Sequence, residues 1–184
     1  AKIDHPNVVQ VYNVGHDHGH YYIVMQFVEG ESLQDLIERE GRLSLTVATR
    51  IIRAIALALA EAHGKNVVHR DIKTANIMIG KDERPRLTDF GLARNIEPDK
   101  GLTMPGTIMG TPGYIAPEVI EGKPADFRAD QYALGVAYYY LLSGTLPHKG
   151  KTAYEIFSKQ LTDRPVPLLS LAPEVPAPIG ELVH

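Results

Sequence analysis

Two short polar clusters, separated by one apolar strand, constrain this chain more than any other feature. The first is His-Arg-Asp-Ile-Lys-Thr-Ala-Asn at 69–76, and the second is Asp-Phe-Gly at 89–91. The carboxylate of Asp71 can accept the proton of a hydroxyl group, and Lys73 can neutralise a moving phosphoryl group. Asn76 and Asp89 offer oxygen ligands of the kind that Mg²⁺ prefers. The pattern therefore predicts a phosphoryl-transfer site on loops between strands.

The bulk composition excludes several classes of function. A chain of 184 residues with 44% hydrophobic composition can bury a sizeable core in one domain. The net charge of -3 argues against a nucleic-acid partner. The absence of cysteine excludes disulfides, thiolate zinc sites and cysteine nucleophiles, and it fits a cytoplasmic location. The most apolar stretches, 51–60 and 132–142, are shorter than the ~18 residues that cross a bilayer, so we expect no membrane segment in this chain, although a longer parent protein can be anchored outside it.

Hydrophobic patterns predict an α+β chain. β-Branched and aromatic runs at 8–14 and 21–27 predict an antiparallel hairpin, which Glu29-Gly30-Glu31 should end. Helices are expected at 32–40, at 44–64 with Ser44 or Thr46 as the N-cap, at 126–143 and at 152–161. Short extended pieces are expected at 67–68, 76–79 and 86–88. The segment 93–112 lacks periodicity and should be a mobile loop, and prolines exclude a long helix from 164 to 179.

Further motifs follow the two polar clusters in a fixed order. Gly-Tyr-Ile-Ala-Pro-Glu occupies 113–118, and Asp130 precedes Leu-Gly at 134–135. This ordered set resembles the protein kinase family over essentially the whole chain. The resemblance implies a protein kinase-like α+β fold, consisting mainly of the helical C-terminal lobe with a β-hairpin remnant of the N-terminal lobe. Residues 1–28 would be the remnant of the small lobe and the hinge, and residues 29–184 would be a large lobe truncated at its C-terminus.

Other features of the family are missing from the sequence. No Gly-x-Gly-x-x-Gly loop, strand lysine or helix glutamate is found, and residues 3–9 resemble the segment that follows that glutamate. We therefore expect a fragment that also lacks the last helices of the large lobe and is itself inactive. A smaller departure is Thr74, which stands where similar kinases commonly have proline.

The resemblance implies a role for each residue of the polar clusters. Asp71 would be the catalytic base, and Lys73 would steady the γ-phosphoryl group of ATP. Asn76 and Asp89 would bind Mg²⁺, or Mn²⁺ in its place. His69 would be structural.

The segment after the hairpin resembles the hinge that binds adenine. Met25 matches the position that guards the pocket, and the hinge backbone would pair with the purine edge. The ribose would meet one of two polar side chains at the start of the next helix. The residues with these expected roles in ATP binding are Met25, Gln26, Phe27, Val28, Ser32, Asp35 and Met78.

Regulatory and structural roles also follow from the resemblance. Arg70 would anchor a phosphorylated activation loop, whose candidate acceptors are Thr103 and Thr107, with Thr107 preferred. Phe90 and Gly91 would set active or inactive geometry. Glu118 would pair with an arginine of a later helix, and Asp130 would bind the backbone of the His-Arg-Asp turn.

The function implied is an ATP- and magnesium-dependent protein kinase. Lys73 and Thr111 favour serine or threonine acceptors in protein substrates over tyrosine, and the texture of 28–33 and 142–147 is similar to bacterial serine/threonine kinases. A homodimer that phosphorylates itself in trans is compatible with this function. The alternatives are a catalytically silent kinase-like scaffold and a small-molecule phosphotransferase.

Overall fold

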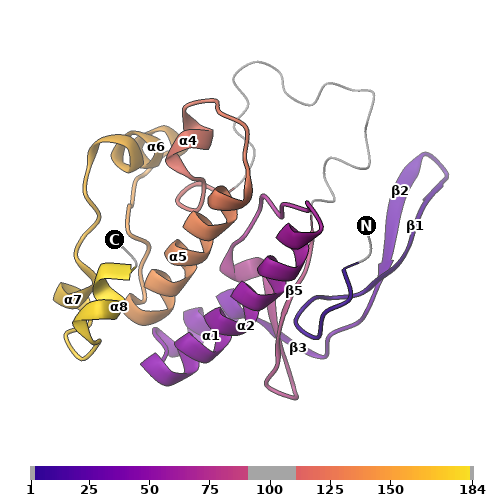
Figure 1. Cartoon of the computed structure of the whole chain (residues 1–184), viewed down its shortest axis with the longest axis horizontal. Coiled ribbons are helices and arrows are strands. Elements are labelled where there is room, and N and C mark those ends of the chain that lie inside the picture. The colour runs from indigo at the N-terminus through magenta and orange to yellow at the C-terminus, as the bar shows by residue number, and fades with distance from the viewer. Residues whose placement is uncertain (1–2, 91–110, 183–184) are drawn as a thin grey trace.

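The computed structural model describes residues 3–90 and 111–182, and it is α+β as expected (Figure 1). Gly91, Thr103 and Thr107 lie outside the described residues, as does most of the segment 93–112. The elements in chain order are β1 (Val11–Asp17), β2 (His20–Met25), β3 (Gly30–Ser32), α1 (Leu33–Glu40), α2 (Leu45–Gly64), a 3₁₀ turn (Thr74–Asn76), β4 (Ile77–Gly80), β5 (Pro85–Leu87), α4 (Pro117–Ile120), α5 (Phe127–Ser143), α6 (Ala153–Thr162), α7 (Leu168–Leu171) and α8 (Ala177–Leu182). None of the helices in these two ranges is long and apolar enough to span a bilayer.

Strands β1 and β2 form the predicted antiparallel hairpin, which projects from the helical body (Figure 1). Its turn is His18-Gly19, and both residues have positive φ (47° and 82°), as a type I′ hairpin turn requires. The strands therefore run further into the turn than the sequence pattern predicts. Val8, expected in the first strand, instead forms a parallel bridge to Leu87 in β5. Residues before the hairpin are thus anchored on the strand that leads to Asp89.

A second sheet, in the order β3-β4-β5, contains the strand that follows the first polar cluster and the strand that precedes the second. The hairpin ends at Met25, before residues 29–31, as predicted, but Gly30 also begins a strand that was not expected. Gly30 pairs with Gly80, and a Cβ at Gly30 would collide with the carbonyl of Ile79. The expected pieces at 76–79 and 86–88 are confirmed as β4 and β5. No strand forms at 67–68, where the N–H of Val67 turns back to the carbonyl of Ala62 at the end of α2.

The longer helices begin at the expected residues because polar side chains cap them. Ser32 and Asp35 form a reciprocal capping box at α1, and Ser44, not Thr46, accepts from the N–H of Val47 at the start of α2. Asp126 caps α5 in the same way. In the proline-rich C-terminal part only the short α7 and α8 form, so the expected absence of a long helix at 164–179 is confirmed.

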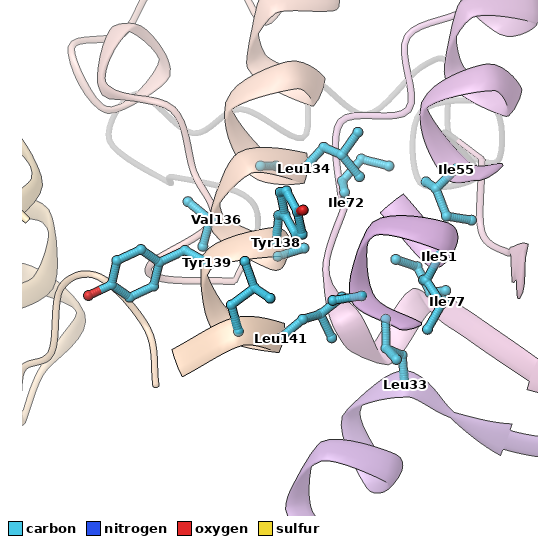
Figure 2. Packing of buried hydrophobic residues seen from close by; sticks show 14 of the residues in the cluster. Leu33, Ile51, Ile55, Ile72, Ile77, Leu134, Val136, Tyr138, Tyr139 and Leu141 are labelled. Atoms are coloured by element: carbon cyan, nitrogen blue, oxygen red, sulfur yellow. The ribbon is translucent and has the colours of Figure 1, made fainter. Parts of the chain in front are cut away.

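The main core lies between α2 and α5 (Figure 2). Ile51 and Ile55, four residues apart in α2, are buried against Leu141 and its neighbours in α5. Each such side chain contributes roughly 1.5 to 3 kcal/mol of burial free energy. Ile72 and Ile77 belong to the same core, and they lie directly beside the polar residues of the first cluster. The loop that carries the first polar cluster is therefore held in place by packed apolar side chains.

Candidate active site

The side chains of Asp71, Lys73 and Asn76 contact one another next to this apolar core. The Nζ atom of Lys73 is 2.8 Å from Oδ2 of Asp71. The amide of Asn76 donates to the backbone carbonyl of Asp71 at 2.8 Å and to its Oδ2 at 3.0 Å. Asn76 is 7% exposed, whereas the side chain of Asp71 is 38% exposed. The carboxylate is thus oriented from the protein side and accessible from the solvent side.

His69 is buried behind this carboxylate and joins the two polar clusters. Its Nδ1 accepts from the N–H of Asp71 at 3.2 Å, and its Nε2 lies 2.8 Å from the carbonyl of Thr88. A carbonyl only accepts, so the ring is neutral with its proton on Nε2. Burial lowers the pKa of His69, in agreement with that state. The ring also packs against Phe90, with centroids 4.6 Å apart.

The neutral state of His69 predicts a pH-dependent stability. Its folded pKa lies below the ordinary value of 6.5, so the unfolded chain takes up a proton first as the pH falls. The stabilisation is complete above pH 6.5 and is lost as the pH falls toward the folded pKa. Urea unfolding of the wild type should therefore give a lower midpoint at about pH 5.5 than at about pH 7.5.

Burial lowers the pKa of His148 as well, so that residue contributes to the same trend. The His148→Asn variant isolates the contribution of His69, and the double variant His69→Asn/His148→Asn should lose most of the remaining dependence. An unchanged slope in the double variant would contradict this account of His69.

Asp130, at the start of α5, holds the backbone of the first cluster from behind. It is 1% exposed, and its carboxylate accepts from the N–H groups of His69 and Arg70, both at 2.8 Å. A third donor, Nε2 of His63 in α2, lies 2.8 Å from Oδ2. The sequence pattern does not single out His63; its place in the last turn of α2 is the only signal. Arg70 has φ 70°, a left-handed conformation that these hydrogen bonds stabilise.

The two expected metal ligands are brought near each other by one backbone hydrogen bond. The N–H of Thr88 donates to the carbonyl of Asn76 at 2.9 Å, and Asp89 follows at once with φ 64°. Over the described ranges, neither Oδ1 of Asn76 nor the exposed carboxylate of Asp89 accepts a hydrogen bond, so both are open to a cation. No group of three or more His, Cys, Asp or Glu within those ranges could hold a metal. Such a pair suits Mg²⁺, which takes its other ligands from water and phosphate.

The residues expected to bind ATP lie along the connection from β2 to α1 and on β4. Met25 ends β2, and its sulfur lies 3.9 Å from the hydroxyl of Thr88, one residue before Asp89. Phe27 is 86% exposed. Met78 is the register partner of Ser32 across β3 and β4, while Asp35 bonds the Ser32 hydroxyl at 2.6 Å. The structure thus brings Ser32, Asp35 and Met78 together.

Gln26 and the next two hinge residues differ in their backbone bonding. The N–H of Gln26 donates to the carbonyl of Gln10 at 2.8 Å, so this group is already used. In the part of the chain that the structure describes, the backbone groups of Phe27 and Val28 make no hydrogen bond. The backbone N–H and C=O groups of Phe27 and Val28 are therefore available on this connection.

The regulatory residues that the structure describes lie around the first cluster. Arg70 is exposed and makes no ion pair with any described residue, and it lines a small pocket together with Thr111. Glu118, in the first turn of α4, also lacks an ion pair within 3–90 and 111–182. Its expected arginine partner is not found among these residues.

Thr74 makes contacts that no sequence pattern indicates. Its buried hydroxyl donates to Oε1 of Gln34 in α1, so the hydroxyl of Tyr114 must be the donor in its 3.0 Å bond to Thr74. Burial raises the pKa of Tyr114 to about 12, which keeps that proton in place. A threonine here thus links α1, the first cluster and the segment that begins at Thr111, where proline could not.

Comparisons with known proteins agree with this arrangement. A family profile described as "Protein kinase domain" matches residues 1–177. The serine/threonine-protein kinase pkn2 of Myxococcus xanthus is 38% identical over 187 residues, which cover 99% of this chain and 22% of that relative. The serine/threonine-protein kinase PrkC of Bacillus subtilis is 35% identical over 183 residues, covering 100% and 28% of the two chains. For the serine/threonine-protein kinase PknJ of Mycobacterium tuberculosis the identity is 44% over 151 residues, covering 80% and 25%.

All three relatives are bacterial, in keeping with the character expected from the sequence. The chain spans about a quarter of the length of these curated relatives. The profile covers nearly the whole chain, and it runs through both polar clusters and the helices that position them. The chain therefore belongs to the protein kinase domain family.

Proposed function

We propose that the full-length protein is a magnesium- and ATP-dependent serine/threonine protein kinase. The observation that carries the proposal is the cluster of Asp71, Lys73 and Asn76, in which one carboxylate is oriented by an amide and faced by an ammonium group 2.8 Å away. The names of the relatives support the same reaction class. A silent scaffold has no need of an oriented, solvent-open carboxylate.

In the proposed mechanism, Asp71 accepts a hydrogen bond from the serine or threonine hydroxyl of the substrate. It takes the hydroxyl proton as the oxygen bonds to the γ-phosphorus of ATP, while the bond from that phosphorus to the bridging oxygen breaks and ADP leaves. The amide of Asn76 prevents the carboxylate from rotating away. Lys73 neutralises charge on the γ-phosphoryl group from its place beside Asp71. Mg²⁺, held by Asn76 Oδ1 and Asp89, would neutralise the phosphate oxygens of bound ATP.

ATP recognition is proposed along the connection that contains Phe27 and Val28. Their free backbone groups suit the donor and acceptor edge of adenine, whereas the N–H of Gln26 is already bonded. Ser32, Asp35 and Met78 lie further along the same path, where the ribose and the base would rest. The 184 residues contain no Gly-x-Gly-x-x-Gly loop to hold the phosphates, so we propose that they show little or no turnover by themselves.

The metal role of Asp89 gives a direct test in the full-length protein. The Asp89→Asn variant should transfer ³²P from ATP to protein substrates at least about 100-fold more slowly, because a neutral amide is a weaker ligand for Mg²⁺. Raising the Mg²⁺ or Mn²⁺ concentration should recover part of the rate.

The matched control is Asp163→Asn, the same change at an exposed residue that ends α6. It should leave both the rate and the metal dependence unchanged. If Asp89→Asn keeps the wild-type rate at every metal concentration, Asp89 is not a metal ligand.

A further inference from the structure

A pocket of about 570 Å³ lies beside the first cluster, between α1 and the end of α5. Gln34 of α1, Lys73 and Thr74 line one part of it, and Thr145 and Lys149 beyond α5 line another. Among the described residues 3–90 and 111–182, its lining includes no aspartate or glutamate, and the charged residues are the two lysines. The pocket is large enough for a side chain together with its flanking backbone.

The walls of this pocket are held in place by neutral hydrogen bonds. Gln34 bonds Thr74 through Oε1, and its Nε2 lies 3.3 Å from the hydroxyl of Tyr140. Tyr114 donates to Thr74 from the other side. Glu38, the acidic residue next to this wall, is outside the lining and accepts from Nε2 of Gln34 at 2.6 Å. The walls therefore offer polar contacts without a negative charge.

The charge that remains in the pocket comes from Lys149. Lys73 is paired with Asp71 at 2.8 Å, whereas the exposed Nζ of Lys149 has no ion-pair partner within the described ranges. The carbonyl of Lys149 accepts from Nζ of Lys159, which also occupies the carboxylate of Glu155, both at 2.8 Å. The carboxylate of Glu155, in the first turn of α6, is thus already paired with Lys159, and Lys149 is anchored through its backbone carbonyl.

The pocket adjoins the proposed site of phosphoryl transfer. Lys73 belongs to both, and Thr111 lines both this pocket and the one that contains Asp71. A hydroxyl held at Asp71 would therefore place neighbouring substrate residues in or over the pocket. Extended chain advances about 3.3 Å per residue, so only a few residues separate the two positions.

We propose that this pocket receives an acidic side chain of the protein substrate near the acceptor, and that Lys149 determines this specificity. The proposal rests on the proposed kinase function. A positively charged pocket attracts a glutamate or aspartate side chain and repels a lysine or arginine side chain. The preference for an acidic residue therefore comes from attraction and repulsion together.

The test uses the full-length protein and peptides with a single threonine acceptor. Glu, Ala or Lys is placed in turn at successive positions on both sides of that threonine. The wild type should show kcat/KM about fivefold higher for Glu than for Ala at one or two adjacent positions, the effect of one partly exposed ion pair, and lower values for Lys there. Lys149→Glu should reverse this order, whereas Lys151→Glu, the same change two residues away and outside the lining, should keep it.

A second measurement separates this inference from the proposed function. The same peptides with alanine in place of threonine cannot be phosphorylated, and their binding is followed by fluorescence anisotropy. If the Glu peptide binds more tightly than the others and Lys149→Glu removes that difference, the pocket assignment is supported, whether or not any peptide is phosphorylated. If no peptide is phosphorylated, only the kinase proposal is overturned. Equal use and equal binding of the Glu, Ala and Lys peptides would overturn the pocket assignment, and so would a preference that Lys149→Glu leaves intact.

Discussion

Replacing Asp71 with asparagine in the full-length protein should lower the rate of phosphoryl transfer by about 10² to 10⁴, the usual contribution of a positioned general base. An amide has nearly the same shape as the carboxylate, but it cannot take the hydroxyl proton. The hydrogen bonds from Asn76 end on the carbonyl of Asp71 as well as on its side chain, so the loop has a second point of attachment in the variant. ATP affinity, measured by calorimetry, should therefore change less than about threefold while the rate falls.

The control for this prediction is Asp17→Asn, on the exposed part of the hairpin. It should have the wild-type rate, since the one ion pair that Asp17 makes within residues 3–90 and 111–182 is the exposed contact with His18. A wild-type rate for Asp71→Asn would remove Asp71 from the mechanism. Loss of ATP binding together with activity would show that the substitution had disturbed the fold instead.

The second large effect is expected at Asp130, which is buried and bonds the backbone of the first cluster. Asp130→Asn should lower the free energy of unfolding by ~3 kcal/mol, because one oxygen acceptor becomes an amide donor that faces N–H groups in a buried site. Typical domains have only about 5 to 15 kcal/mol of stability, so the change should be plain in urea unfolding. Activity should fall too, since His69 and Arg70 lose the contact that fixes their backbone.

Asp126→Asn is the matched change on the same helix. Asp126 is partly exposed and caps α5 through the N–H of Arg128, and asparagine caps a helix about as well as aspartate. Its free energy of unfolding should change by less than ~0.5 kcal/mol. Equal stability of the two variants would mean that the buried hydrogen bonds of Asp130 add nothing to the fold.

The helices could be predicted from the sequence because their signals are local. Ser32, Ser44 and Asp126 each stand within three residues of the N–H group that they cap. The β3 strand was not predictable in this way, since Gly30 has low strand propensity and acquires its structure only by pairing with Gly80, 50 residues later in the chain.

The same distinction applies to the candidate site. Asp71, Lys73 and Asn76 lie within six residues, so their meeting follows from the loop itself. The contact of Thr74 with Gln34 spans 40 residues, and that of His63 with Asp130 spans 67. Such contacts depend on how α1, α2 and α5 pack, which hydrophobic periodicity does not specify. For this reason the pocket near Lys149 could not be predicted from the sequence.

The short segment before the hairpin ties two distant parts of the molecule together. Leu87 is held by residues of this segment on both sides of its peptide unit: its N–H donates to the carbonyl of Asn7 at 2.8 Å, and its carbonyl accepts from Val9 at 2.8 Å. Asp89 follows only two residues later. The hairpin and the proposed metal ligand Asp89 are thus connected through the backbone hydrogen bonds of Leu87. A tilt of the hairpin about these bonds would displace the Asp89 carboxylate through the backbone alone, without a side chain between them.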